Sequence, residues 1–224
     1  MFKDANYKTK WATLNTYYHG LPHSRQRLYL IAVRKDSLAN PIEFPKSTGE
    51  PVPLSSFLEA DGKSKSIDET TFKKTARVNI YFASTALDNM SEPIDYRGNT
   101  TVAVDVHAGK HKAFGIEYIP CLTRARGGTG GDYLLNKRRR TSIVDMTKLQ
   151  GIPASRLQWE KAGISKTAMG RILGNAMSVN ILERVFACVL HSAGLRTISK
   201  ADNNKWGGVA NLQSSTDTLA RLGT

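Results

Sequence analysis

Two arginines near the amino terminus have the spacing of a clamp for anionic groups. Arg25 and Arg27 lie two positions apart, directly before the apolar run 28–33. This run is short and rich in β-forming residues, so it predicts a buried strand. Alternate strand residues share a face, and two guanidinium groups on one face can bind a phosphate or a base edge. Taken alone, the pattern favours a simpler alternative, a pair of solvated arginines at a strand end.

A second candidate is the glycine-rich stretch 127–131, which has arginines on both sides. Arg124 and Arg126 precede it, and the basic run 137–140 follows after a short apolar piece. Arginines beside a glycine loop can contact phosphates and base edges in a DNA groove. The alternative is an ordinary hairpin with a charged rim. A nucleotide-binding loop is a weaker interpretation, because its strand, helix and lysine are missing from the pattern.

The charge distribution also favours a polyanionic partner. The 224 residues carry a net charge of +13, and residues 107–148 hold nine Lys and Arg against three Asp and Glu. Nucleic acid is the commonest partner of such a chain, although a soluble basic surface has the same composition. Cys121 and Cys188 are too few for a disulfide framework or a four-ligand zinc site, so no metal site is predicted. The longest apolar runs, 28–33 and 185–190, are much shorter than a membrane span, and no membrane contact is expected.

Further strands and a connector must position these residues. Apolar and β-branched runs at 78–82 and 101–106 predict two more strands. Residues 40–68 contain four prolines and two glycines, which predicts a connector between the larger elements. One short helical turn is expected inside this connector, at 54–58.

Two helices are expected in the second half of the chain. A short helix is predicted around 145–150, where Gly151 and Pro153 would end it. Apolar residues at helical spacing predict an amphipathic helix over 179–190. The tail from residue 197 is polar and is expected to be a loosely docked or disordered end.

Three segments, in this order, resemble motifs of the DNA cytosine-5 methyltransferases. Residues 20–33 resemble motif VIII, with a Gly-x-Pro turn, the two arginines and an apolar strand; His23 stands where the family has glutamine. Residues 139–153 resemble motif IX, which begins at Arg139 or Arg140 and ends in Leu149-Gln150-Gly151-Ile152-Pro153. Within it Asp145 and Lys148 replace Glu and Arg, and their spacing predicts an ion pair on the short helix. Residues 171–180, with Gly174-Asn175-Ala176, resemble motif X.

The resemblance implies roles for particular residues. Arg25 and Arg27 would belong to the catalytic site, where the second arginine reaches the extruded cytosine and steadies the catalytic glutamate. Asn175 and Ala176 would line the S-adenosyl-L-methionine pocket. The target-recognition region between motifs VIII and IX would contact double-stranded DNA. Its expected DNA contacts are Arg124, Arg126, Gly127, Gly128, Arg138 and Arg139.

The Pro120-Cys121 dipeptide looks like the catalytic pair of this family but stands in the wrong place. In the family the nucleophilic cysteine precedes motif VIII, whereas Cys121 follows it and lies just before the glycine-rich stretch. We therefore expect Cys121 to be a small buried residue and not a nucleophile.

Several motifs of the family are not found in this sequence. The first is the Phe-x-Gly-x-Gly loop, which binds the methyl donor. The second is a Pro-Cys-Gln ahead of motif VIII, which supplies the thiolate. The third is a Glu-Asn-Val, which supplies the acid that protonates the ring nitrogen. We therefore expect the carboxy-terminal half of such an enzyme, inactive by itself and needing an amino-terminal half from the same gene or another subunit. One alternative is a DNA-binding module, derived from such an enzyme, that has lost its chemistry. The other is an unrelated basic nucleic-acid-binding protein.

The resemblance implies an α/β fold, in which part of an S-adenosylmethionine-dependent methyltransferase sheet domain carries an inserted, mostly β target-recognition lobe. Residues 1–40 would end the sheet domain, and residues 41–140 would form the recognition region. Residues 141–195 would return to the sheet domain, and 196–224 would be a polar tail. By itself the first part would expose apolar surface that fits a missing half.

Overall fold

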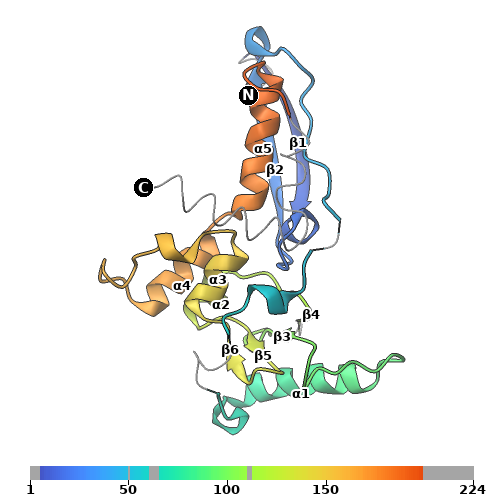
Figure 1. Cartoon of the computed structure of the whole chain (residues 1–224), viewed down its shortest axis with the longest axis vertical. Coiled ribbons are helices and arrows are strands. Elements are labelled where there is room, and N and C mark those ends of the chain that lie inside the picture. The colour runs from blue at the N-terminus through green and yellow to red at the C-terminus, as the bar shows by residue number, and fades with distance from the viewer. Residues whose placement is uncertain (1–5, 50, 61–65, 110–112, 199–224) are drawn as a thin grey trace. The chain divides into compact units, whose positions relative to one another are not determined.

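The chain forms two compact units with mixed helices and strands (Figure 1). The structure is a computed structural model that describes residues 6–49, 51–60, 66–109 and 113–198. Unit 1 consists of Met1–Leu21, Arg25–Val52 and Met177–Thr224, and unit 2 of Pro22–Ser24 and Pro53–Ala176. Beyond Ile198, the predicted tail lies outside the described residues.

Unit 1 is built on an antiparallel pair of nine-residue strands, β1 (Tyr7–Asn15) and β2 (Gln26–Arg34). Their register runs without a break from Tyr7 opposite Arg34 to Asn15 opposite Gln26. Strand β2 confirms the predicted strand at 28–33. Strand β1 was not predicted, because Leu14 is its only buried residue and the remainder lacks an apolar pattern.

Helix α5 (Val179–Ser192) covers one face of this strand pair. It confirms the amphipathic helix predicted over 179–190, and its apolar stripe packs on alternate residues of β2. The shared core consists of Leu14, Tyr29, Ile31, Val33, Ile42, Ile181 and Val185.

The opposite face of the strand pair carries large exposed apolar side chains. Trp11, Leu28 and Leu30 are 68%, 67% and 52% exposed. Trp11 lies opposite Leu30, and Leu28 lies opposite Thr13, so all three share the face that alternates with the buried one. This matches the expectation that the first part of the chain exposes apolar surface.

A buried histidine ties the 3-10 helix Thr16–His19 to α5 within unit 1. The His19 carbonyl accepts a hydrogen bond of 2.7 Å from the Asn180 side chain. The His19 Nδ1 accepts from the guanidinium of Arg184, which also donates to the Lys46 carbonyl at 2.6 Å. Since an arginine only donates, the ring must be neutral. Burial, with the Arg184 charge as a second cause, lowers the pKa of His19 to about 4.

We therefore expect unit 1 to lose stability in mild acid. The unfolded pKa of histidine is near 6.5, so the contribution of neutral His19 is complete above that pH and is lost as the pH falls toward 4. The loss should reach about 3 kcal/mol. In His19→Asn the side-chain oxygen can still accept from Arg184 but does not titrate. Urea unfolding at pH 7.5 and pH 4.5 should show the smaller acid loss in this variant.

The quantity to compare is the difference in unfolding free energy between the wild type and His19→Asn at each pH. Asp132 of unit 2 has its pKa raised to about 7, so its contribution to stability has the opposite pH dependence over an overlapping range. That contribution is common to both proteins and cancels in the comparison. A difference in unfolding free energy that stays constant between the two pH values would contradict the role given to His19.

Unit 2 contains a four-stranded antiparallel sheet with very short strands, in the order β4-β3-β5-β6. Its strands are β3 (Val102–Val104), β4 (Phe114–Ile116), β5 (Tyr133–Leu134) and β6 (Arg139–Arg140). Strand β3 confirms that the predicted strand at 101–106 exists, with narrower limits.

Helix α1 (Lys74–Asp88) covers one face of this sheet, and it corrects the prediction of a strand at 78–82. The β-branched and aromatic residues that suggested a strand, such as Val78 and Tyr81, are exposed. The residues that face the sheet recur at intervals of three and four, which is the period of a helix. They are Ala76, Ile80, Ala83 and Leu87.

The other face of the sheet packs against helices α3 (Ile143–Leu149) and α4 (Lys166–Asn175), and α2 (Arg124–Gly128) packs on α4. Helix α3 confirms the short helix predicted around 145–150. The 3-10 helix Leu54–Phe57 confirms the helical turn expected in the connector. The core on this side includes Leu54, Ala103, Leu122, Leu134, Met146, Leu149, Met169 and Leu173.

Two parts of the expected architecture need correction. The region 41–140 is not mostly β, because its described strands have two or three residues whereas α1 has 15. The chain was expected to leave this region at residue 141. Instead α3 and α4 pack within unit 2, and unit 1 resumes at Met177.

The segment Lys166–Ser192 is long and apolar enough to cross a membrane by length and composition alone. Half of its most apolar window is buried inside the protein. The helical conformation is interrupted between Asn175 and Val179, and each of the two helices buries a face in the core of its own unit. Core helices commonly pass this test, so the finding is weak evidence for a membrane span.

Candidate functional site

The two arginines of the motif VIII segment lie at the start of β2 but differ in exposure. Arg25 precedes the strand and is 5% exposed, whereas Arg27 is exposed and donates a hydrogen bond to the Gln26 carbonyl at 2.7 Å. Burial raises the pKa of Tyr29, and the charges of both arginines oppose this shift. Residues 25, 27 and 29 are therefore close in space, as expected for alternate positions on one face.

His23, which replaces the family's glutamine, is completely buried in unit 2. Its Nδ1 lies 3.2 Å from the Leu149 carbonyl, and its Nε2 accepts from the Leu122 amide at 3.0 Å. A ring that donates at one nitrogen and accepts at the other must be neutral, with its proton on Nδ1. A glutamine amide also offers one donor and one acceptor. The ring can thus replace it, and it joins three segments that are distant in sequence.

The first part of the glycine-rich stretch is a helix and not a loop. Thr123 caps α2, because its side chain accepts a hydrogen bond from the Arg126 amide at 3.3 Å. Gly127 is buried against α4, where a Cβ would lie 1.9 Å from the carbonyl oxygen of Gly170. Gly127 therefore allows two helices to pack closely, which is a different role from the expected approach to DNA. Gly128 adjoins the side chain of Arg171, and Gly130 and Gly131 have positive φ angles of 97° and 73°.

The motif IX segment is organised by a buried ion pair. Arg139 and Asp145 are joined at 2.6 Å, and their side chains are 4% and 0% exposed. Asp145 also accepts from the amides of Ser142 at 2.8 Å and Glu59 at 2.7 Å, and the Ser142 side chain completes a capping box at the start of α3. The carboxylate therefore pairs with Arg139, and the expected partner Lys148 is not its cation.

This geometry decides between Arg139 and Arg140 as the first residue of motif IX. Arg139 is the buried partner, so we remove it from the set of expected DNA contacts. Arg140 lies over the ring of Phe72 at 5.1 Å and donates to the carbonyls of Thr129 and Gly131. Of the other expected contacts, Arg124 and Arg138 are exposed.

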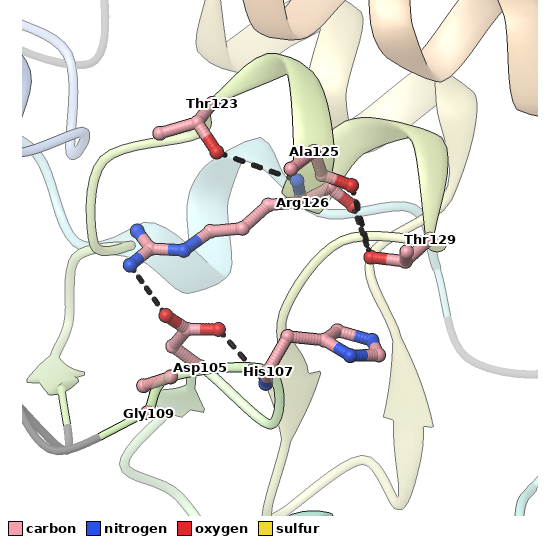
Figure 2. A pocket seen from close by; sticks show the side chains of 8 residues that line it. Asp105, His107, Gly109, Thr123, Ala125, Arg126 and Thr129 are labelled. Carbon is pink, nitrogen blue, oxygen red and sulfur yellow. Dashed lines mark hydrogen bonds and ion pairs between the residues drawn. The ribbon is translucent and has the colours of Figure 1, made fainter.

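A pocket of about 410 Å³ opens beside α2 in unit 2 (Figure 2). Its volume lies toward the lower end of the range for small-molecule sites, about 300–1,000 Å³. The Arg126 side chain extends from α2 to the Asp105 carboxylate, with which it forms an ion pair (Figure 2). Asp105 also accepts from the His107 amide at 3.0 Å. The pocket is lined by Asp105, His107, Ala108, Gly109, Thr123, Ala125, Arg126 and Thr129.

The acidic residues of this pocket region were missed in the sequence. Asp105 ends a predicted strand and Asp132 follows the glycine-rich stretch, but nothing in either segment shows that they belong together. The register of β3 and β5 brings them to the same end of the sheet. Cys121 lies nearby and is partly buried, and its carbonyl accepts from the Arg126 guanidinium.

The motif X residues lie where α4 ends. Asn175 is the last residue of α4 and is exposed, and Ala176 is the C-cap, with an amide that donates to the Ile172 carbonyl at 2.9 Å. An exposed side-chain amide followed by a small residue can accept a polar ligand without rearrangement.

A family profile described as C-5 cytosine-specific DNA methylase matches residues 1–191. The chain belongs to this family. A similar curated protein is the Type II methyltransferase M.HaeII of Haemophilus aegyptius, 25% identical over 190 residues. The match covers 82% of this chain and 51% of the relative, so the chain spans about half the length of that enzyme.

Two solved structures have a similar fold. The methyltransferase EhMeth of Entamoeba histolytica has a TM-score of 0.52 and 16% identity, over 88% of this chain and 57% of that one. A protein encoded within an E. coli prophage, described as a DNA modification methyltransferase, has a TM-score of 0.51 and 14% identity, over 85% and 62%. At this identity the likeness concerns the fold alone.

Proposed function

We propose that this chain is the carboxy-terminal, DNA-reading part of a DNA (cytosine-5-)-methyltransferase. In this proposal it binds double-stranded DNA and completes the site in which a methyl group passes from S-adenosylmethionine to cytosine. The cofactor loop, the nucleophilic cysteine and the catalytic glutamate come from an amino-terminal half. Membership of the family makes the third alternative, an unrelated nucleic-acid-binding protein, untenable.

The exposed face of the β1–β2 pair is the observation that carries the proposal. Trp11, Leu28 and Leu30 form an apolar surface on strands whose other face is already buried. Exposed clusters of large apolar side chains on a soluble protein usually mark an interaction surface. The half-length match to a complete methyltransferase supports the view that this surface receives the remaining part of the catalytic domain.

The DNA contacts that we propose follow from charge and exposure. Arg124 and Arg138 are exposed on unit 2, in a chain with a net charge of +13. They can contact phosphates, whereas Arg126 is bound to Asp105 in the free protein. On unit 1, Arg25 and Arg27 are proposed to face the extruded cytosine and the glutamate of the other half.

S-adenosylmethionine, when bound, would supply the methyl group. The exposed amide of Asn175 and the small Ala176 are the residues of this chain that we propose to contact it. Most of its pocket would belong to the amino-terminal half. The alternative function is a DNA-binding module without chemistry, and the presence of Arg27 and Asn175 is a mild argument against it.

A methyl-transfer assay distinguishes these functions. The purified chain should transfer no labelled methyl group from S-adenosylmethionine to duplex DNA, because it lacks the motifs for the nucleophile and the donor loop. Adding an amino-terminal half that carries both should produce transfer. Methyl transfer by the chain alone would refute the proposal that an amino-terminal half supplies the nucleophile and the cofactor loop. If the reconstituted pair bound DNA but transferred no methyl group, the alternative function, a DNA-binding module without catalytic activity, would be favoured.

A further inference from the structure

Two buried carboxylates lie near one guanidinium at the end of the unit 2 sheet, and the guanidinium is bonded to one of them. Val104 of β3 pairs with Tyr133 of β5, so Asp105 and Asp132 are the next residues on neighbouring strands. Asp105 and Asp132 alternate with Val104 and Tyr133, which face α1. They therefore point to the other side of the sheet, which α3 and α4 cover. Side chains in such positions are about 5 Å apart at Cβ, and like charges there destabilise the sheet.

The two carboxylates have very different surroundings. Asp105 is paired with Arg126 and accepts from the His107 amide. Asp132 is completely buried, and among the described residues neither of its carboxylate oxygens has a hydrogen-bond partner. Burial raises the pKa of Asp132 to about 7, with Asp105 acting in the same direction and Arg126 and Arg140 in the opposite one. Asp132 is thus poised between a neutral and a charged form.

A second carboxylate, that of Asp132, lies within range of the charge on Arg126. Helix α2 is held against α4 by the contact of Gly127 with Gly170, whereas the Arg126 side chain extends across the pocket to Asp105 (Figure 2) and also donates to the Cys121 carbonyl. Its charge already acts on Asp132 as well as on Asp105. A rotation of the side chain that breaks its bonds to Asp105 and to the Cys121 carbonyl would be needed to move the ion pair to Asp132.

We propose that Arg126 moves from Asp105 to Asp132 when DNA enters this pocket, and that the freed Asp105 accepts a hydrogen bond from the amino group of a base. This inference rests on the proposed DNA-binding function and names the residues that would give it sequence selectivity. A carboxylate that accepts a hydrogen bond from a base edge selects a base with an exocyclic amino group, such as cytosine. One ion pair is lost and one is formed, so the exchange leaves no carboxylate without a cation or donor.

The exchange must release a proton. Asp132 is partly protonated in the free protein near pH 7, and pairing with Arg126 favours its ionised form, so the proton passes to the solvent. Binding that releases a proton strengthens as the pH rises toward and through the pKa of the free group. The charged groups that act on Asp132 are Arg126 on α2, Asp105 beside β3 and Arg140 on β6, and His107 contacts Arg140. Protonation of histidines would give the opposite trend, because it strengthens DNA binding at low pH.

The test uses the full chain and a pool of duplex DNA with a randomised centre. After selection of the bound duplexes, affinities are measured by fluorescence anisotropy at pH 6 and pH 8. We expect the wild type to bind the selected duplex about tenfold more tightly at pH 8, since linkage allows up to tenfold per pH unit. Asp132→Asn should lose this dependence. Asp105→Asn should lose the preference for selected over random duplex.

A second measurement does not depend on variants that could misfold. Calorimetric titration of the wild type in two buffers with different ionisation enthalpies should show release of up to one proton on binding the selected duplex. Binding without proton release, or selection of the same sequence by folded Asp105→Asn, would overturn this inference alone. Absence of binding to any duplex would overturn the proposed DNA-binding function with it.

Discussion

Replacing Arg139 by Met should lower the free energy of unfolding of unit 2 by about 4 kcal/mol. The substitution removes the only cation paired with Asp145 among the described residues and leaves a carboxylate with no exposed surface. Breaking one side of a buried ion pair costs about 3–5 kcal/mol, because the remaining charge stays desolvated. Urea unfolding followed by circular dichroism at pH 7 measures the effect.

A double-mutant cycle separates the ion pair from the other roles of Asp145. In Arg139→Met/Asp145→Leu no buried charge is left unpaired, so the loss should be smaller than the sum of the single losses. Some loss should remain, because Asp145 also accepts from the amides of Ser142 and Glu59. Additive single effects would mean that the two residues do not interact.

Arg34→Met provides a matched control for this experiment. Arg34 also pairs with an aspartate, Asp36, but both side chains are at least half exposed to solvent. Exposed pairs contribute little to stability, so this variant should unfold almost like the wild type. If Arg139→Met proved equally harmless, Arg139 would be free to contact DNA, as the basic run 137–140 first suggested.

The elements that could be predicted from the sequence are those with a local apolar pattern. Strand β2 and helices α3 and α5 show their period within their own residues, and the structure contains all three. Helix α1 was mistaken for a strand, because β-branched and aromatic residues lie together on its exposed side. Its helical period is visible only when the small residues Ala76 and Ala83 are included in the buried stripe.

The two buried carboxylates beside the candidate pocket could not be predicted, because they come together only through strand pairing. Asp105 and Asp132 belong to separate segments, and a single sequence does not give the register of two strands. The role of Arg139 was ambiguous for a related reason. Alternation along β6 places Arg139 and Arg140 on opposite faces, but the face that meets Asp145 becomes known only from the fold.

Gly127→Ala should destabilise unit 2 by about 3 kcal/mol, although alanine normally favours a helix over glycine by about 1 kcal/mol. The added Cβ would lie 1.9 Å from the carbonyl oxygen of Gly170, and because that atom is backbone it cannot rotate away. Gly170→Ala should have a similar effect, since its Cβ would meet the Gly127 carbonyl oxygen at 2.0 Å. Thermal and urea unfolding of both variants measure the loss.

Gly128→Ala is the matched control, because it changes the neighbouring residue of the same short helix. Its Cβ would meet side-chain atoms of Arg171, which is exposed, so a change of the Arg171 χ1 rotamer relieves the contact. We therefore expect this variant to keep nearly wild-type stability. Equal stability of Gly127→Ala and Gly128→Ala would show that α2 and α4 tolerate separation. The glycines would then be explained better by close approach of the backbone to DNA than by helix packing.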